Sequence, residues 1–351
     1  MKRMLEKQFK KIYVTLGFAC NFNCLYCVQD EGYSRHSLCK DVPELSEKLL
    51  AYLDTYPYEG TELIFWGGEP LIYFASMKEI IERYGDKFKY GFVTNGSLLT
   101  EEIVSYFESK EITFALSHDG YATKKTRRVD VLEDPAIKSL LLQSPSFGGF
   151  ASVYSAENSS YLKLLHYYKE QGFKDKPVQV DMIYNTKDTT EQCRLSQIPS
   201  DTYEKALKAL LRNFDRPDVN PIAVQRLLHI NGQIDRPELV CGCNVMCSTC
   251  KDMLNLDYEG NVYICHNSTY KLGTVEDSYS AIYQGYCDYL KRNFTPKCKD
   301  CDINGLCSGA CLLLTEKGQE DYCRIRHIEI ATILAWLEQM KGEMEDDTGA
   351  V

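Results

Sequence analysis

The sequence has no excess of basic residues, no long apolar run and no secretory signal, and each absence excludes a class of protein. The formal net charge is −10, so the chain has no basic surplus with which to neutralise nucleic-acid phosphates. No stretch approaches the roughly 18 to 20 apolar residues that a membrane helix needs. The N-terminus, MKRMLEKQFKKIYV, lacks the apolar core and cleavage site of a signal peptide. We therefore expect a cytoplasmic protein without nucleic-acid or membrane partners.

Cysteine is abundant and unevenly distributed. Of 16 cysteines in 351 residues, three lie in CNFNCLYC (20–27), eleven lie between Cys241 and Cys323, and Cys39 and Cys193 are isolated. A reducing compartment disfavours a disulfide framework, so metal binding or redox chemistry is the better interpretation. Three thiols are one short of a closed four-ligand site. The first group therefore raises the question of what supplies its fourth ligand.

The first 185 residues alternate β-rich runs with amphipathic stretches. Strands are predicted at 11–16, 62–66, 90–94, 112–117, 147–154 and 178–184, and helices at 43–56, 77–85, 100–107, 135–143 and 159–172. This alternation implies parallel strands with crossover helices. Six units are too few for a full eight-stranded barrel, so we predict an α/β fold, either a partial barrel or an open sheet. Its active site should lie at the C-terminal ends of the strands, where the cysteine motif, GGEP, TNG and SHDG all fall.

The rest of the sequence is less regular. Residues 202–214 predict a helix, and residues 215–240, with three prolines, indicate a linker. LNLDYEGNVYIC (254–265) predicts a β-hairpin whose turn carries Gly260, so that a thiol from each arm can meet one metal. Residues 325–340 predict a helix, and we expect the polar end, 341–351, to fray.

The cysteines of the first group form the motif CxxxCxxC. They are Cys20, Cys24 and Cys27, and Tyr26 precedes the last of them. Three thiolates can hold three irons of a [4Fe–4S] cluster and leave the fourth iron open, as a catalytic metal requires. By itself the motif is equally compatible with part of a zinc site or with chance.

GGEP (67–70) follows the second predicted strand at the same rim of the sheet. Paired glycines let a ligand approach the backbone closely, and the Glu69 carboxylate can accept a hydrogen bond from a ligand ammonium group. By itself GGEP would be interpreted as an ordinary turn.

Together, CxxxCxxC, GGEP, TNGSLL (94–99) and LSHDG (116–120) resemble the radical S-adenosylmethionine (SAM) superfamily over residues 10–185. The resemblance implies a partial (β/α)6 barrel of the TIM type, in which the amino and carboxylate groups of SAM chelate the open iron. The reduced cluster then cleaves SAM to a 5′-deoxyadenosyl radical, which abstracts a hydrogen from the substrate.

The resemblance also implies a set of cofactor-binding residues. Besides the cluster ligands Cys20, Cys24 and Cys27, the set is Tyr26, Gly67, Gly68, Glu69, Asn95, Ser117 and Arg127. Tyr26 is expected beside the cluster, the GGE residues at the methionine amine, and Ser117 near its carboxylate. Arg127 and Arg128 both have the spacing of a SAM-contacting arginine, and we favour Arg127. Asn95 could instead serve only as a turn residue before glycine.

The later cysteines resemble the SPASM domain, an extension of radical SAM enzymes that carries two auxiliary [4Fe–4S] clusters. The matching spacings are Cx9Gx4C from Cys250 and CxxCx5Cx3C from Cys298. The resemblance implies a first auxiliary cluster held by Cys250, Cys265, Cys311 and one of Cys241, Cys243 or Cys247, with Cys243 nearest the expected separation. The second would be held by Cys298, Cys301, Cys307 and Cys323. A zinc ribbon is the alternative, because CxxC pairs are common in zinc sites.

These resemblances predict four segments and a function. The segments are a radical SAM barrel at 1–200, a helical linker at 201–240, a SPASM domain at 241–330, and a helix with an acidic tail at 331–351. We expect an enzyme that crosslinks or epimerises a ribosomally made peptide. The alternative is an anaerobic sulfatase-maturating enzyme, which forms formylglycine. That branch carries an Asp base immediately after the Gx4C cysteine, whereas this chain has His266, a tentative base with a near-neutral pKa.

The expected partners are a peptide or protein substrate and a reductant such as flavodoxin or ferredoxin. Only some 19 residues precede Cys20, which leads us to expect leader recognition by a separate protein, if at all. A non-enzymatic iron–sulfur carrier or zinc scaffold has no use for an open three-cysteine motif. Cys39, Cys193 and Cys287 fit neither cluster and are expected to be small buried residues. His118 is expected to line the pocket.

Overall fold

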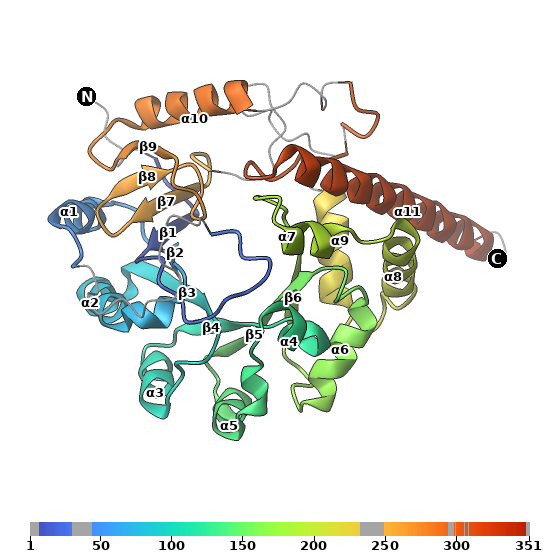
Figure 1. Ribbon diagram of the computed structural model, residues 1–351, viewed down its shortest axis with the longest axis horizontal. Coiled ribbons are helices and arrows are strands. Elements are labelled where there is room, and N and C mark those ends of the chain that lie inside the picture. The colour runs from blue at the N-terminus through green and yellow to red at the C-terminus, as the bar shows by residue number, and fades with distance from the viewer. Residues whose placement is uncertain are drawn as a thin grey trace. The chain divides into compact units, whose positions relative to one another are not determined.

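The structure is a computed structural model that describes residues 7–29, 44–231, 249–293, 298, 300–304, 306–307 and 309–348. Its contacts divide the chain into two compact units. Unit 1 comprises residues 1–118, 123–151 and 247–294, and unit 2 comprises residues 119–122, 152–246 and 295–351. Each unit is therefore assembled from segments that are far apart in the sequence (Figure 1).

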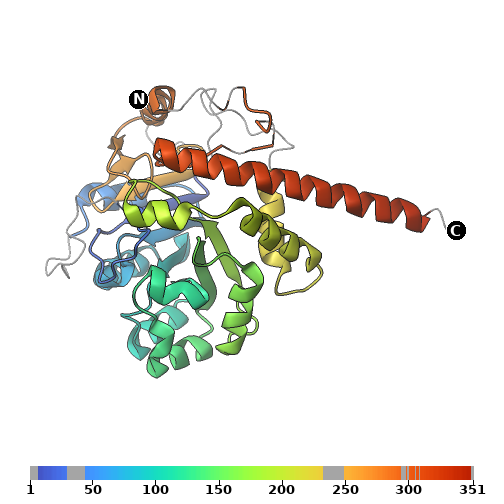
Figure 2. The same cartoon turned by 45° about the vertical axis from the view of Figure 1, so that its right-hand side comes forward.

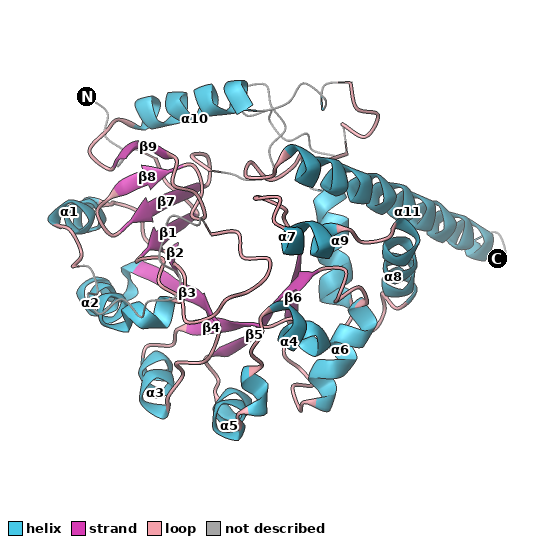
Figure 3. Cartoon of the chain, viewed as in Figure 1, coloured by secondary structure: helices cyan, strands magenta, loops and turns pink. Residues whose placement is uncertain are grey.

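Unit 1 is built on a twisted sheet of mostly parallel strands (Figure 3). In spatial order they are β5 (Phe147–Tyr154, whose last three residues belong to unit 2), β4 (Thr113–Ser117), β3 (Phe88–Thr94), β2 (Thr61–Trp66), β1 (Lys11–Thr15), β7 (Met253–Asp257), β8 (Asn261–Tyr263) and β9 (Lys271–Thr274). The pairs from β5 to β7 are parallel, and β8 and β9 add an antiparallel edge.

The helices of unit 1 lie outside the curve of the strands (Figure 1). They are α1 (Glu47–Thr55), α2 (Phe74–Tyr84), α3 (Glu101–Ser109), the short α4 (Thr123–Thr126), α5 (Pro135–Gln143) and α10 (Tyr279–Asn293). Three of them begin at a side-chain cap: Ser46, Thr100 and Asp134 accept hydrogen bonds from the first turns of α1, α3 and α5. Short 3₁₀ turns occupy Pro70–Tyr73, Gly85–Lys87 and Val131–Glu133.

The two faces of the unit 1 sheet differ in burial. On one face, side chains such as Phe65, Phe92 and Phe114 are buried, and the Phe92 ring lies 4.8 Å from Phe107 of α3. On the other face, alternate residues such as Trp66 and Ser117 are only half-buried. Because neighbouring parallel strands keep side chains in register, these half-buried residues form one continuous inner face.

Unit 2 is mainly helical. It holds the end of β5, β6 (Val178–Met182), a 3₁₀ turn (Gly120–Ala122), α6 (Tyr161–Glu170), α7 (Thr190–Ser196), α8 (Ser200–Arg212), α9 (Asn220–Asn231) and α11 (Glu316–Thr348). α8 packs along α11, which is one long continuous helix (Figure 2). The Phe214 and Trp336 rings, 5.6 Å apart, add an aromatic contact at α11.

All six predicted strands are present within a few residues of their predicted bounds. The expected helical linker contains α9, with Pro221 in its first turn, where proline is tolerated. Two expectations about the rest of the chain were wrong. α11 continues to Thr348 instead of fraying after residue 340. The strand β7, expected in a separate domain, pairs in parallel with β1 and extends the main sheet. Among the described residues no helix is both long and apolar enough to cross a bilayer.

Candidate functional site

The three predicted cluster cysteines lie on the loop that follows β1, which we call the three-cysteine loop (residues 17–29). Cys20, Cys24 and Cys27 are half-buried free thiols. The Phe22 amide donates to Cys20 Sγ at 3.4 Å, and the Cys27 amide donates to the Cys24 carbonyl at 3.3 Å. Burial raises the pKa of Cys20 to about 11. The loop thus presents three thiols at the C-terminal end of a barrel strand, as predicted from the spacing.

The GGEP segment holds this loop through its backbone. The amides of Gly68 and Glu69 donate to the carbonyls of Gly17 and Ala19 at 3.1 and 2.9 Å. A Cβ at Gly67 would overlap the Gly17 carbonyl, and one at Gly68 would overlap the Ala19 carbonyl. The paired glycines therefore allow the three-cysteine loop to approach closely, whereas we had expected them to admit a ligand. Ligand contact by these glycines remains a prediction.

Glu69 is buried and fastens the ends of two strands. Its Oε1 accepts from the Leu71 amide at 3.1 Å and from Thr94 Oγ1 at 2.7 Å, and its Oε2 accepts from the Asn95 amide at 2.7 Å. Burial raises the pKa of Glu69, and the three hydrogen bonds oppose that shift. These bonds leave one acceptor position on Oε2. A role for Glu69 in holding the methionine amine stays a prediction.

Asn95 links the turn after β3 to the three-cysteine loop. Its Nδ2 donates to Asn21 Oδ1 at 2.9 Å, and its Oδ1 accepts from the amide and hydroxyl of Ser97 at 2.9 and 2.6 Å. Asn21 in turn donates to Ser97 Oγ at 2.7 Å. Asn95 therefore forms the expected turn and also positions the loop.

The structure distinguishes the two candidate arginines. The Arg127 guanidinium lies 5.4 Å from the centroid of the Tyr26 ring, within cation–π range. The neighbouring Leu25 amide donates to the Thr126 carbonyl at 2.8 Å, so the segment around Arg127 is joined to the three-cysteine loop. Arg128 is exposed and has a φ of 71°. Ser117, at the end of β4, lies on the half-buried inner face.

His266 occupies an aromatic site at the hairpin end. Its ring stacks on Tyr13 with centroids 4.2 Å apart and meets the edge of Trp66 at 4.4 Å. Its Nδ1 lies 3.2 Å from Asn255 Oδ1, an acceptor, so the proton belongs on Nδ1 and Nε2 keeps its lone pair. Burial lowers the pKa of His266 to about 3, although its side chain keeps some exposure. The near-neutral pKa that we expected is therefore wrong.

The predicted hairpin is confirmed, and a cysteine lies beyond each of its arms. β7 and β8 pair through Leu256 and Val262, and Gly260 lies in the turn with a φ of 77°. Cys265 follows the end of β8, and the Cys250 amide before β7 donates to the Met253 carbonyl at 2.8 Å. Burial raises the pKa of Cys250 to about 12.

The prediction for the first auxiliary cluster also includes Cys311 and Cys243. Cys311 belongs to unit 2, whereas Cys250 and Cys265 belong to unit 1. Cys243, together with its alternatives Cys241 and Cys247, lies outside the described residues. The complete ligand set of this cluster therefore stays a prediction.

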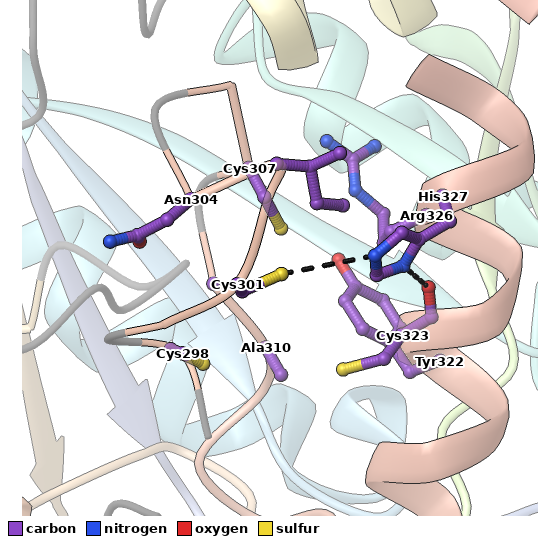
Figure 4. A pocket seen from close by; sticks show the side chains of 11 residues that line it. Cys298, Cys301, Asn304, Cys307, Ala310, Tyr322, Cys323, Arg326 and His327 are labelled. Carbon is purple, nitrogen blue, oxygen red and sulfur yellow. Dashed lines mark hydrogen bonds between the residues drawn. The ribbon is translucent and has the colours of Figure 1, made fainter. Parts of the chain in front are cut away.

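The four cysteines predicted for the second auxiliary cluster line a single pocket in unit 2, the cysteine pocket (Figure 4). Cys298, Cys301, Cys307 and Cys323 share it with Tyr322, Arg326 and His327. His327 is held by contacts with the Cys323 carbonyl at 2.8 Å and Asp302 Oδ1 at 3.0 Å. Ligand atoms of Cys301, Asp302 and His327 lie within 4.8 Å of one another, so a single metal ion such as zinc is an alternative occupant.

Buried charge surrounds the cysteine pocket. Arg326 makes a side-chain hydrogen bond to Cys307 and an ion pair with Glu329. Glu329 also lies 3.8 Å from Arg226, and all three charged side chains are almost fully buried. A cluster held by four thiolates is anionic, and a buried guanidinium that bonds one of its sulfurs stabilises it. The pocket therefore fits such a cluster, with four thiols and a cationic donor.

Several other residues differ from expectation. His118, expected to line the pocket, is buried with both ring nitrogens in polar contacts. Cys287 is buried as expected, but it is disulfide-bonded, which departs from the view that the chain avoids disulfides. Cys193 is a half-buried free thiol, and Cys39 lies outside the described residues.

Sequence reasoning missed residues that support the site. Tyr73 accepts the Ala19 amide through its hydroxyl at 2.9 Å, and Gln29 donates to the Gly67 carbonyl. Arg326 and Asn255 were also overlooked. None of them stands in a motif. The available signal for Tyr73 and Gln29 was their closeness to GGEP and the cysteines, which says nothing about side-chain direction.

Comparison with known proteins gives a consistent result. Residues 14–138 match the family model of the Radical SAM superfamily. The radical SAM cyclopropyl synthase TigE of Paramaledivibacter caminithermalis is 25% identical, covering 89% of this chain and 69% of the relative. The serine-type anaerobic sulfatase-maturating enzyme of Bacteroides thetaiotaomicron is 23% identical, covering 86% of this chain and 83% of the relative.

Solved structures of other proteins have a fold similar to that of this chain. The enzyme anSMEcpe with bound AdoMet aligns with a TM-score of 0.70 at 19% identity, over 94% of this chain and 98% of that chain. Streptococcus suis SuiB bound to its precursor peptide SuiA aligns with a TM-score of 0.57 at 14% identity, over 87% and 72%. The predicted α/β partial barrel with a cysteine-rich C-terminal part is thereby confirmed.

Proposed function

Because residues 14–138 form a Radical SAM domain and the chain is thus a radical SAM enzyme, we propose that it modifies a ribosomally made peptide. Three free thiols on one loop, locked against the GGEP backbone, are the observation that carries this proposal. A [4Fe–4S] cluster held there, with SAM bound, would supply the radical chemistry that abstracts hydrogen from the substrate. A non-catalytic electron carrier or zinc scaffold does not account for this domain.

Cys20, Cys24 and Cys27 would hold that cluster. The chain's remaining contributions are positional: Asn95 and GGEP hold the loop, and Tyr26 orients Arg127 beside it. We assign Arg127 and Ser117 to SAM, because Arg127 is joined to the loop and Ser117 ends the next barrel strand but one from GGEP. Arg128, which is exposed and has a left-handed φ of 71°, has no such support.

The surroundings of His266 favour peptide maturation over formylglycine formation. Formylglycine formation calls for a base that deprotonates the Cys or Ser side chain, and the resemblance puts an Asp at this position. Here a neutral imidazole with a pKa of about 3 is packed between Tyr13 and Trp66, so it is a weak proton acceptor. TigE, a cyclopropyl synthase by its name, is a relative whose reaction is not formylglycine formation, whereas similarity to the sulfatase-maturating enzyme keeps that alternative open.

The later cysteines would hold two auxiliary clusters that accept the electron left on the oxidised substrate. Cys298, Cys301, Cys307 and Cys323 are assigned to one of them, and Cys250, Cys265, Cys311 and Cys243 to the other. A cytoplasmic reductant such as flavodoxin or ferredoxin would reduce the cluster held by Cys20, Cys24 and Cys27. SuiB, which was solved with its precursor peptide, is a structural precedent for a peptide substrate.

The test is anaerobic reconstitution followed by metal analysis and product analysis. Three clusters correspond to about twelve irons per chain, and dithionite-reduced protein should convert SAM to 5′-deoxyadenosine. The triple variant in which Cys20, Cys24 and Cys27 are each replaced by Ala should form none of this product. A colourless protein with stoichiometric zinc, or cleavage retained in the triple variant, would refute the proposal.

The substrate is tested separately with two peptides. Co-expression with a short precursor peptide encoded beside the enzyme, followed by mass spectrometry, is compared with a sulfatase-derived peptide containing Cys or Ser. A crosslink shows as loss of hydrogen mass and epimerisation as a changed configuration at unchanged mass. Formylglycine in the second peptide, with no change in the first, would favour the sulfatase alternative.

A further inference from the structure

We propose that His118 is a positioning residue that clamps the Arg127 segment onto the three-cysteine loop and thereby sets the affinity for SAM. The proposal rests on the function proposed above, in which Arg127 contacts SAM. It concerns a histidine that stands in LSHDG but is not among the predicted cofactor-binding residues. The interactions that carry it all lie within unit 1.

One buried imidazole joins both ends of the segment that carries Arg127. His118 Nδ1 lies 3.1 Å from Thr123 Oγ1, four residues before Arg127, and its Nε2 lies 3.0 Å from Asp130 Oδ1, three residues after it. His118 is 1% exposed, and its own amide donates to the Ala151 carbonyl of β5 at 3.0 Å. The clamp is therefore anchored in the sheet.

The clamped segment is short and strained, so it needs support. The Arg127 amide donates to the Thr123 carbonyl at 2.7 Å, which closes one tight turn. Arg128 then adopts a left-handed φ of 71°, which costs a non-glycine residue roughly 1–2 kcal/mol. Such a conformation persists only where its surroundings hold it, and the His118 contacts lie on either side of it. Strain held in this way is typical of ligand sites.

Direct contacts join the clamped segment to the three-cysteine loop. The Thr126 carbonyl accepts the Leu25 amide at 2.8 Å, and Arg127 lies over the Tyr26 ring at 5.4 Å. The two ring contacts of His118 are made with Thr123 and Asp130, which are neither cluster ligands nor the SAM-binding arginine. Removing the His118 imidazole should leave the cluster ligands intact and free the segment to move. SAM binding would then have to order the segment, which lowers the affinity for SAM.

The test measures the SAM dissociation constant of reconstituted protein by anaerobic equilibrium dialysis, with iron content determined in parallel. His118→Leu removes both contacts at similar volume and should raise the Kd for SAM about tenfold, with iron content unchanged. His118→Gln can keep one donor and one acceptor and should recover much of that affinity. Thr61→Val, which removes a buried hydrogen bond to the Phe9 carbonyl at the far end of β2, is the matched control and should bind SAM normally.

The decisive comparison is made in an Arg127→Ala background. If His118 acts through Arg127, adding His118→Leu there should change the Kd by less than about twofold. A full tenfold loss in that background, or wild-type affinity in His118→Leu alone, would overturn the clamp while leaving the proposed function intact. If Arg127→Ala itself binds SAM normally, the Arg127 assignment fails, and the clamp fails with it. If His118→Leu does not fold, Thr123→Val provides the same comparison, because it removes one of the two ring contacts of His118.

Discussion

The three-cysteine loop of unit 1 and the cysteine pocket of unit 2 both gather thiols, but they are held by different forces. The loop is fixed by backbone hydrogen bonds to GGEP and by neutral side chains such as Asn95 and Tyr73. The pocket is set among buried ions, with Arg326 bonded to a cysteine and to Glu329. Three thiols on a neutral, half-buried loop leave room for a further ligand. Four thiols backed by a guanidinium suit a closed, anionic cluster.

The largest expected effect comes from breaking the backbone contact that holds the loop. Gly68→Ala would place a Cβ against the Ala19 carbonyl, so the loop must move away. We expect formation of 5′-deoxyadenosine to fall by roughly 100-fold or more, because a displacement near 1 Å can have that cost. Gly285→Ala, whose Cβ would meet only atoms at 3.8 Å, is the control and should behave as wild type. Unchanged cleavage in Gly68→Ala would show that the loop does not depend on this contact.

Removing a ligand from the pocket should separate the two regions. In Cys323→Ala the second auxiliary cluster should be lost, with about a third of the iron, while SAM cleavage without peptide continues. Peptide modification should fall sharply, because only the first auxiliary cluster would remain to accept the electron left on the substrate. Iron analysis, 5′-deoxyadenosine and modified peptide are measured on the same sample. Simultaneous loss of SAM cleavage would contradict the separation of roles.

The buried ions of unit 2 can be tested through stability. Arg326→Leu leaves Glu329 buried with only the more distant Arg226, and breaking a buried pair in this way costs about 3 kcal/mol. The free energy of unfolding, measured by denaturant titration of the reconstituted protein, should fall by that amount. Arg83→Leu, which breaks the exposed pair with Asp54, is the control and should leave the free energy of unfolding nearly unchanged. Equal losses in both variants would show that burial of the pair is unimportant.

The smallest effect concerns His266 in unit 1 and depends on pH. Burial holds the folded pKa of His266 at about 3, below the unfolded value of about 6.5. Between these values the unfolded state binds more protons, so the stability contribution is present above pH 6.5 and is lost as pH falls toward 3. Because each pH unit between these values is worth about 1.4 kcal/mol, His266→Gln should reduce the loss of stability between pH 6.5 and pH 5 by about 2 kcal/mol. The exposed His166→Gln is the matched control, and an unchanged slope in His266→Gln would indicate that His266 is not desolvated.

Much of the fold was readable from the sequence because its signals are local. Alternation of burial along a strand and the three- to four-residue spacing of helices depend on neighbours in the chain, so β5 was predicted at its observed bounds, 147–154. The hairpin around Gly260 is likewise a local turn. The three-cysteine motif and GGEP were recognisable because the chemistry of the site requires these residue types at these spacings.

Tertiary structure alone decided which distant residues meet. Sequence spacing made both Arg127 and Arg128 candidates. The structure distinguishes them because the Arg127 guanidinium lies over the Tyr26 ring, whereas Arg128 is exposed. The pairing of β7 with β1 joins segments some 240 residues apart, which no local pattern encodes. The same holds for Arg226 and Glu329, which come from different helices. The sequence by itself determined strands, helices and the thiol spacings through near-neighbour periodicity. Which side chains support the thiols, and with what charge, was decided by packing, because desolvation and hydrogen bonding depend on neighbours in space.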